Sequence, residues 1–322
     1  MTFNHHEAYL CALAQTGHEF FVVTKYRNLN LNWNKAQQPV PPNMQLCEWD
    51  KNLETKIEAN FFDVIICHTI KNLFWLWRYK NAKFIFIAHI PLFTYTLPLK
   101  FKSFCKKMLF RCFRKTHNVH FHAVSEFKRQ SWGEVGSVAV LAPQKRLAPQ
   151  SGEGYGQIIL VANEIEKRKD ELGYPLLEYV VNQGLPLKII GNNVGAPYFV
   201  KPIDFADFQR QMASGRIYLY TISQPYGDGY NTAMLEAMSL GMAIVTVENP
   251  SSPIVHGKNG LVVKSKTELV DALKKLLNDR ALVDRLGTAA KQTIAENFST
   301  KLFLKNWQEM FRDVRTIPEL SN

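Results

Sequence analysis

Short, continuous apolar runs alternate with helical patterns along almost the whole chain. The runs predict strands at 19–24, 45–49, 64–69, 83–89, 119–125, 138–143, 158–163, 187–192, 217–223, 243–248 and 261–264. Because these runs are continuous and not interleaved with polar residues, we expect helices to cover both faces of the sheets. The alternation of strand and helix predicts βαβ units and therefore parallel sheets. After residue 265 the pattern is helical to the end of the sequence.

One stretch rich in Gly, Ser and Pro, APQSGEGYGQ at 148–157, interrupts this pattern and is followed by a new strand. It predicts a linker between two α/β domains. We therefore expect domains at 1–148 and 149–322, with the last helix able to pack back on the first domain. The first domain opens with a helical pattern at 5–20, so its first strand is expected to be missing or reduced to a few residues.

The chain carries a net charge of +11, which favours anionic partners such as phosphorylated ligands, nucleic acid or acidic lipid. Five scattered cysteines without a C-x-x-C pair predict reduced thiols in a cytoplasmic protein. No apolar run is long enough to span a bilayer, and the opening MTFNHHEAYL lacks the features of a secretory signal. Nucleic acid is disfavoured as a partner, because no stacking platform or DNA-binding motif occurs.

The segment QPYGDGYNTAMLEAMSLGMAIV, residues 224–245, combines a loop, a short apolar helix and the start of a strand. Asn231 is suited to cap the helix, whose free N–H groups would favour an anion. Glu236 lies about one turn inside, among apolar neighbours that predict burial. A buried carboxylate needs a partner. Two interpretations stay open: Glu236 binds the hydroxyls of a ribose, or it faces solvent or pairs with a distant arginine.

This segment resembles the signature of retaining glycosyltransferases of the two-Rossmann (GT-B) fold, the group 1 glycosyltransferases. Their pattern is E-x-F-G-x-x-x-x-E-A-M-A-x-G-x-P-V-V, and the acids, the Glu-Ala-Met triplet, the glycine and the following strand fall in register here. Further runs resemble other family segments in the same order: GHEFFVVT, FFDVIICHT, FIFIAH, HAVSEF, ILVANEIEKRKD and HGKNGLVV. The resemblance therefore covers most of the chain and implies a GT-B fold with a helical C-terminus.

The resemblance implies a nucleotide-sugar donor, with UDP-glucose as the best guess, and a glycan or lipid-linked acceptor in polysaccharide biosynthesis. Glu236 would bind the ribose, while Arg168 and Lys169 would neutralise the leaving diphosphate, where charge develops. His89 and Asp228 would be the catalytic residues, acting at the reacting sugar with retention of configuration. The sugar and diphosphate would also contact the loop and helix start at Gly229, Tyr230, Asn231 and Thr232. The donor is a substrate, so no cofactor is implied.

The sequence departs from the family pattern at several points. Asp228 replaces a glutamate, Asn231 a glycine, and Asn163 the usual arginine after the first strand of the second domain, and the glycine-rich acceptor loop of the first domain is not recognisable. The altered acid and the missing arginine keep a second function class open, a non-catalytic protein that binds nucleotide or glycan and assists a partner enzyme. No D-x-D triplet occurs, which disfavours a metal-dependent enzyme. The pairs His5–His6 and His120–His122 could suggest a metal site. His120 and His122 alternate on a strand without carboxylate or cysteine partners nearby, and ordinary core or surface histidines are the preferred interpretation.

The segment 97–117 is strongly basic, with seven basic residues and no acid between Lys100 and Lys115. As a helix it places Phe101, Cys105, Met108, Leu109 and Cys112 on one side, which we expect to pack inside the domain. The basic side is either a solvated surface or a site for an anionic membrane or lipid-diphosphate acceptor. The expected location is cytoplasmic, with peripheral attachment to the inner face of the membrane as the alternative.

Overall fold

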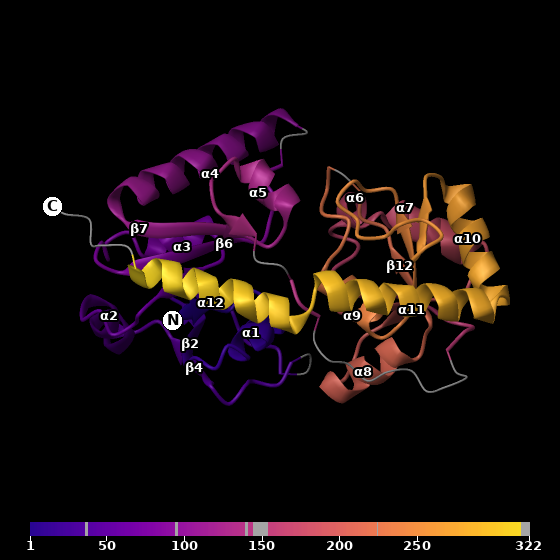
Figure 1. Cartoon of the computed structure of the whole chain (residues 1–322), viewed down its shortest axis with the longest axis horizontal. Helices are drawn as coiled ribbons and strands as arrows, with labels where there is room; N and C mark the ends of the chain where they lie inside the picture. The colour runs from indigo at the N-terminus through magenta and orange to yellow at the C-terminus, as the bar shows by residue number, and fades with distance from the viewer. Residues whose placement is uncertain (36–37, 94–95, 139–140, 144–153, 224, 317–322) are drawn as a thin grey trace. The chain divides into compact units, whose positions relative to one another are not determined.

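The computed structural model describes the chain except residues 36–37, 94–95, 139–140, 144–153, 224 and 317–322. The chain forms two compact units (Figure 1). The first unit comprises Met1–Asn34, Val40–Leu141 and Thr300–Asn322, and the second comprises Lys35–Pro39 and Ala142–Ser299. Most of the predicted linker, from 148 to 153, lies outside the described residues.

The first unit is built on a sheet in the order β3-β2-β1-β5-β6-β7-β8, with β4 also paired to β2. All pairs are parallel except β2 with β3. The strands are β1 Thr2–Phe3, β2 Phe20–Tyr26, β3 Leu29–Asn30, β4 Met44–Glu48, β5 Ile65–Cys67, β6 Lys83–Ala88, β7 Asn118–Ala123 and β8 Ser137–Val138. The helices are α1 Glu7–Ala14, α2 Lys51–Glu58, α3 Ile70–Trp75, α4 Leu97–Thr116, α5 Glu126–Trp132 and α12 Thr300–Thr316.

The first strand is present but only two residues long. Thr2 of β1 pairs with Val22 of β2 on one side and with Ile66 of β5 on the other. A strand of two residues shows no periodicity, which is why the sequence pattern could only indicate that it was missing or very short. Its central place in the sheet brings the start of the chain between two apolar strands.

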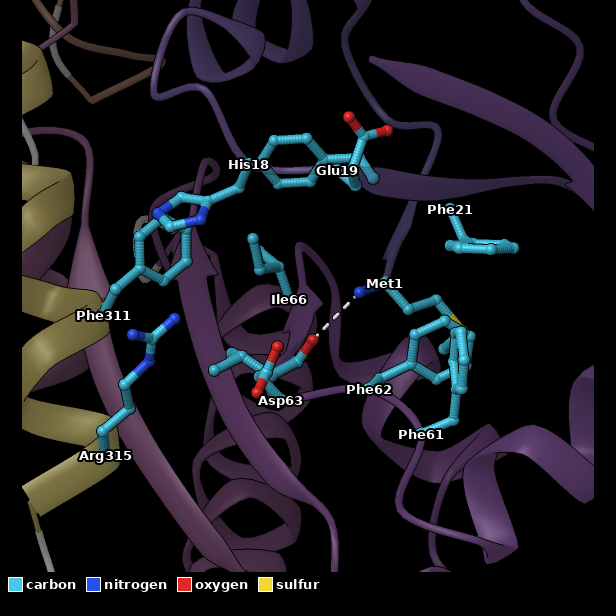
Figure 2. Close-up of a pocket in the computed structure, with 12 residues that line it drawn as sticks. Met1, His18, Glu19, Phe21, Phe61, Phe62, Asp63, Ile66, Phe311 and Arg315 are labelled. Carbon is cyan, nitrogen blue, oxygen red and sulfur yellow. Dashed lines mark hydrogen bonds between the residues drawn. The ribbon is translucent and has the colours of Figure 1, made fainter.

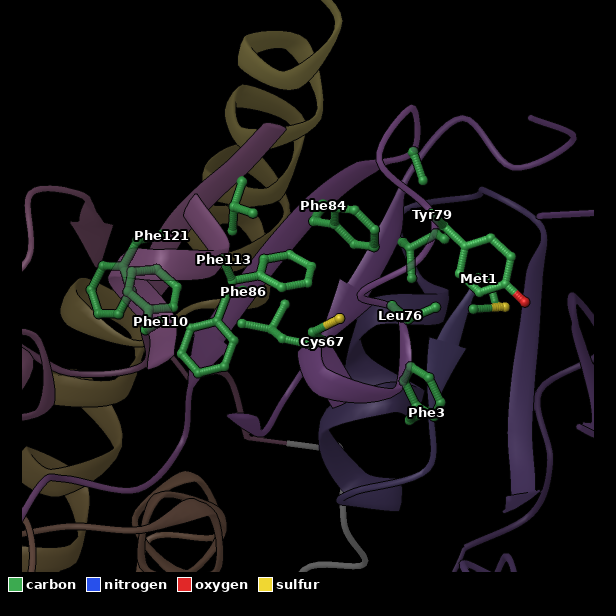
Figure 3. Packing of buried hydrophobic residues seen from close by; sticks show 14 of the residues in the cluster. Met1, Phe3, Cys67, Leu76, Tyr79, Phe84, Phe86, Phe110, Phe113 and Phe121 are labelled. Carbon is green, nitrogen blue, oxygen red and sulfur yellow. The ribbon is translucent and has the colours of Figure 1, made fainter. Parts of the chain in front are cut away.

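Helices cover both faces of this sheet, as the continuous apolar runs predict. On one face, α4 contributes Phe110, whose ring lies 5.1 Å from Phe86 of β6 and 5.5 Å from Phe121 of β7 (Figure 3). On the other face, α12 packs beside α1 and β6 (Figure 1). There the ring of Tyr9 lies 5.6 Å from that of Phe303. The unit is therefore a three-layer α/β structure, and its last helix is supplied by the end of the chain.

The prediction that one apolar side of the 97–117 helix packs inside the domain is wrong. Phe101, Met108, Leu109 and Cys112 are exposed, and Cys105 is half-buried. The buried residues of α4 are Ser103, Phe110 and Phe113. The helix carries apolar residues on two faces. The face with Phe110 and Phe113 packs against the aromatic residues of β6 and β7 (Figure 3).

The second unit contains a parallel sheet in the order β11-β10-β9-β12-β13-β14. Its strands are β9 Ile158–Val161, β10 Leu187–Ile190, β11 Phe199–Val200, β12 Ile217–Tyr220, β13 Ala243–Val247 and β14 Leu261–Val263. Its helices are α6 Lys169–Leu172, α7 Tyr174–Asn182, α8 Phe205–Ala213, α9 Thr232–Ser239, α10 Lys266–Asn278 and α11 Arg280–Asn297. Both short strands that the pattern missed, β3 and β11, have two residues each.

The predicted fold class, two Rossmann-like domains and a helical C-terminus, is confirmed.

Among the described residues, no helix combines the length and apolar character that crossing a membrane requires. The five cysteines are free thiols.

Candidate functional site

The loop between β12 and α9 lies at the carboxyl end of the parallel sheet of the second unit, the edge where such sheets bind ligands. The side-chain oxygen of Asn231 accepts a hydrogen bond from the Met234 N–H at 2.8 Å, which is the predicted helix cap. The backbone of Asn231 is extended, as a cap residue requires, with φ of −141°. The start of α9 is therefore held in a defined direction at this edge.

Two carboxylates are buried at this helix. Glu236 is 2% exposed and Asp228 is 4% exposed. Burial raises the pKa of the nearby Tyr218 hydroxyl, and the charge of Glu236 raises it further. The interpretation in which Glu236 faces solvent is therefore wrong, and pairing within the protein or with a ligand is left. Tyr220 donates a hydrogen bond from its hydroxyl to the Asp228 carbonyl at 2.9 Å, which fixes the backbone beside the carboxylate.

A second loop, after β13, holds the first one in place. The Gly229 N–H donates to Ser251 Oγ at 2.8 Å. Asn249 accepts from the Ser251 hydroxyl at 3.0 Å and donates to the Gly227 carbonyl at 3.1 Å. A Cβ on Gly229 would lie 2.3 Å from the backbone nitrogen of Ser252, so only glycine fits. Asn249 and Ser251 were not predicted to belong to this loop arrangement. Their position just after a strand of the parallel sheet could have indicated it, because loops at that edge of the sheet lie together.

The backbone N–H of Gly229 is thus engaged within the protein in this structure, and its contact with a donor stays a prediction. Thr232 is half-buried as the first residue of α9. Tyr230 is also half-buried, and its ring lies 5.2 Å from that of Phe298 at the end of α11. Asp228, Tyr230, Asn231, Thr232 and Glu236 therefore belong to one contiguous segment in the second unit.

Arg168 and Lys169 lie at the start of α6, after β9. The Arg168 guanidinium forms two hydrogen bonds with the Glu171 carboxylate, at 2.9 and 2.5 Å. Glu171 raises the pKa of Arg168 through this bond. Lys169 places its ammonium 5.4 Å from the ring centre of Tyr174. The spacing of three residues between Arg168 and Glu171 was visible in the sequence, but sequence analysis did not use it.

Asn163, the residue in place of the family's usual arginine, has a structural contact. Its side-chain oxygen accepts a hydrogen bond from the Asn192 N–H at 2.7 Å. This bond joins the residues that follow β9 and β10. Asn163 thus has a structural contact in place of a charge. The two predicted cations, Arg168 and Lys169, lie at the start of α6.

In the first unit, His68 and His89 each follow directly after a strand, β5 and β6. Their ring nitrogens, His68 Nδ1 and His89 Nε2, lie 2.9 Å apart. His68 Nε2 lies 2.8 Å from the hydroxyl of Thr2. Burial lowers the pKa of both imidazoles well below the ordinary value; His5 and His6 lower both pKa values further, and His68 also lowers that of His89. The result is a hydrogen-bonded chain from Thr2 to His89 in which burial disfavours the charged form of both rings.

Two more aromatic rings fix this pair. The His5 ring is stacked near that of His68, with centres 5.7 Å apart and planes at 9°. The Tyr9 ring stands edge-on to His89 at 4.6 Å. Both histidines end strands of the parallel sheet in the sequence pattern, which predicts that their side chains point into the same region, with His89 at the sugar and His68 as a wall residue. The hydrogen bond between the two rings was not predicted.

Among the described residues, no group of three or more His, Cys, Asp or Glu side chains is arranged to hold an ion. His122 Nδ1 instead lies 2.7 Å from the hydroxyl of Ser137, and burial lowers its pKa to about 4. Its neighbour His120 contributes to the same shift. These two histidines of β7 are structural.

A cavity of about 240 Å³ lies in the first unit beside Met1, His18, Glu19, Asp63 and Arg315 (Figure 2). The Met1 nitrogen donates to the Val64 carbonyl at its wall, at 2.9 Å. His18, Glu19 and Asp63 come shortly before β2 and β5, so the cavity lies at the amino ends of the strands. Parallel sheets bind their ligands at the opposite edge. None of the predicted site residues lines this cavity.

The match to a known protein family lies in the second unit. Residues 185–279 match the family model described as glycosyl transferases group 1. An uncharacterized glycosyltransferase of Methanocaldococcus jannaschii is 30% identical over 129 residues, 38% of this chain and 32% of that protein. The poly(ribitol-phosphate) alpha-N-acetylglucosaminyltransferase of Staphylococcus aureus is 25% identical over 205 residues, 62% of this chain and 38% of that protein. The matches thus span about a third of the length of these curated relatives.

Among solved structures, the Anabaena protein HepE in complex with UDP and glucose superposes with a TM-score of 0.68. The superposition covers 97% of this chain and 98% of HepE at 14% identity, so it establishes the fold alone. The family model includes α9, with Glu236, and the loops that follow β12 and β13. Residues 185–279 thus match the group 1 glycosyltransferase domain, and the chain as a whole has the two-Rossmann (GT-B) fold.

Proposed function

We propose that this chain transfers a sugar from a nucleotide-diphosphate sugar, with UDP-glucose as the preferred donor, to a glycan or lipid-linked acceptor. The observation that carries the proposal is the pair of buried carboxylates, Asp228 and Glu236, on either side of the capped start of α9. The UDP and glucose in the HepE structure support this donor class. The name of the Staphylococcus relative supports a polymeric acceptor and a role in polysaccharide synthesis.

In this reaction the chemistry of each side chain suits one part of the donor. The buried Glu236 carboxylate is an acceptor for two ribose hydroxyls, and charge-assisted bonds of this kind are stronger than neutral ones. The N–H groups at the start of α9 favour the diphosphate. Arg168 would exchange its bonds to Glu171 for bonds to phosphate, and Lys169 would add a second charge. Together they would stabilise the leaving group as its charge develops.

His89 is proposed to contact the transferred sugar as a neutral hydrogen-bonding group. Its bond to His68 and the lowered pKa of both rings disfavour an imidazolium at neutral pH. A neutral ring can stabilise a sugar hydroxyl or an oxocarbenium-like transition state without adding a repelling positive charge. We propose that transfer retains the anomeric configuration by front-face substitution, with Asp228 near the sugar, and that no metal takes part.

A second candidate function is nucleotide or glycan binding without turnover, in a protein that assists a partner enzyme. It is favoured by the engagement of Arg168 with Glu171 and of the Gly229 N–H with Ser251. Both groups must be released before they can bind a donor. A non-catalytic protein would bind the nucleotide with the site in its present arrangement and would leave the sugar attached.

Thermal shift with a panel of nucleotide sugars, followed by an assay for released free sugar, tests the two functions together. We expect UDP-glucose to raise the melting temperature most and to lose glucose slowly to water, with release abolished in Asp228→Asn. Stabilisation without any sugar release, with acceptors present, would support the non-catalytic function. No stabilisation by any nucleoside diphosphate at millimolar concentration would contradict the transfer reaction and would limit the second function to glycan binding.

A further inference from the structure

The exposed side of α4 carries a continuous apolar stripe. Leu97 is 80% exposed, Phe101 71%, Phe104 61% and Met108 42%. Their positions follow the spacing i, i+4, i+7 and i+11, which places them on one face of the helix. This face is distinct from the buried one, because Ser103, Phe110 and Phe113 are the residues that contact the core. The stripe therefore has no role in folding the first unit.

The apolar surface continues from α4 onto α3. Phe74 is 67% exposed, Leu109 45% and Trp77 38%. These three side chains line a shallow groove between the two helices, with Ile70, Leu73 and Phe113 at its floor. We call the exposed residues Phe74, Trp77, Leu97, Phe101, Phe104, Met108 and Leu109 the α3–α4 face. A contiguous exposed patch of this kind marks a site of interaction.

The positive charge of α4 beside the α3–α4 face indicates an anionic partner. Arg111 and Arg114 both form ion pairs with the buried Glu134 carboxylate, at 3.0 and 2.9 Å, and are therefore partly neutralised. The remaining cations of α4 are all lysines, Lys100, Lys102, Lys106, Lys107 and Lys115. Lysine side chains beside a stripe of aromatic and aliphatic residues are typical of helices that lie in a lipid interface, where the ammonium groups reach the headgroups.

Other partners fit less well. Two copies of this face would bring their lysines together, and like charges repel. Nucleic acid would satisfy the lysines but would leave the apolar stripe without a partner. An anionic membrane satisfies both parts at once, because its headgroups attract the lysines and its acyl region accepts the apolar side chains.

We propose that the α3–α4 face docks the first unit on an anionic membrane, with Leu97, Phe101 and Phe104 inserted below the headgroups. The lysines of α4 contact the lipid phosphates around them. This inference goes beyond the proposed transfer reaction and does not depend on its donor. The attachment combines insertion with electrostatic attraction, so high salt weakens it without abolishing it.

Sedimentation with phosphatidylcholine vesicles, with and without a minority of phosphatidylglycerol, tests the proposal. The full chain is expected to bind the anionic vesicles much more tightly than the neutral ones. Phe101→Ser with Phe104→Ser should weaken binding by about tenfold or more, since two aromatic side chains no longer leave water. Lys100→Glu with Lys107→Glu should weaken it to a similar degree. Ile203→Ser, at an apolar residue 85% exposed in the second unit, is the matched control and should bind as the parent does.

Each of these variants should keep the thermal shift with UDP, which separates this test from that of the donor site. Undiminished binding by Phe101→Ser with Phe104→Ser would overturn the insertion, and absence of binding to anionic vesicles at low salt would overturn the whole proposal. Sedimentation velocity without lipid tests the alternative that the α3–α4 face binds a second copy of the chain. A dimer of the parent that the two serine substitutions abolish would assign the α3–α4 face to a second copy of the chain instead.

Discussion

Replacement of Glu236 is the most direct test of the donor site. The side chain is 2% exposed and projects from α9 about one turn after the Asn231 cap. In the proposed complex the carboxylate accepts two hydrogen bonds from a ribose. A hydrogen bond to a charged group contributes about 1.5–3 kcal/mol, so the pair amounts to about 3–6 kcal/mol. With 1.4 kcal/mol for each factor of ten, Glu236→Ala should weaken UDP binding by about 10² to 10⁴.

The amide variant refines the same test. Glu236→Gln keeps the size of the side chain and one carbonyl acceptor but loses the charge, so its affinity should lie between those of the parent and Glu236→Ala. Glu248→Gln is a matched control, because that carboxylate is exposed in the same unit and forms an ion pair with Lys264 at 3.2 Å. Its affinity for UDP should equal that of the parent.

Isothermal titration calorimetry with UDP measures these affinities, and a cooperative melting transition for each variant shows that it is folded. An unchanged dissociation constant in folded Glu236→Ala would refute the reasoning. Glu236 would then be a structural carboxylate that pairs within the second unit, and the ribose site would have to lie elsewhere.

Three further predictions follow from the same structure. Asn231→Ala should lower the free energy of unfolding by about 1 kcal/mol through loss of the cap to Met234, and Asn231→Gly by only a few tenths, as measured by urea unfolding. Sugar transfer should persist in EDTA, and activity that requires added manganese would contradict the proposed mechanism. Because burial lowers the pKa of His122 from 6.5 to about 4, the folded chain binds fewer protons than the unfolded chain between these values. Stability is therefore expected to be full above pH 6.5 and to fall as the pH drops from 6.5 towards 4, with a shallower fall in His122→Gln.

Local signals in the sequence were sufficient to predict the local structure of residues 224–245. The cap at Asn231, the apolar surroundings of Glu236 and the flanking strands all depend on residues within about ten positions of one another, where spacing fixes geometry. The resemblance to a known family then supplied the roles that spacing alone left open. The alternation of strands and helices was equally local, so the two parallel sheets were predictable.

Contacts between distant segments were not predictable in this way. Helix α4 has phenylalanines at 101, 104, 110 and 113, and nothing in their spacing shows which pair meets the sheet. In the fold, Phe110 packs against Phe86 and Phe121 of the strands and against Trp132 of α5, which are all distant in the sequence. Likewise, Glu134 binds Arg111 from 23 positions away, so a count of charges within the helix overestimated its free positive charge.

The return of α12 to the first unit has a consequence for how the chain can be made and divided. Phe303 and Trp307 are fully buried against residues such as Tyr9, which the ribosome adds almost 300 positions earlier. The unit that begins first during synthesis is therefore completed last, after the whole second unit has emerged. A fragment cut at residue 141 would expose the surface that α12 covers and is expected to aggregate. Isolation of the first unit requires that residue 141 be joined to residue 300, whereas the second unit can be excised as one nearly continuous piece.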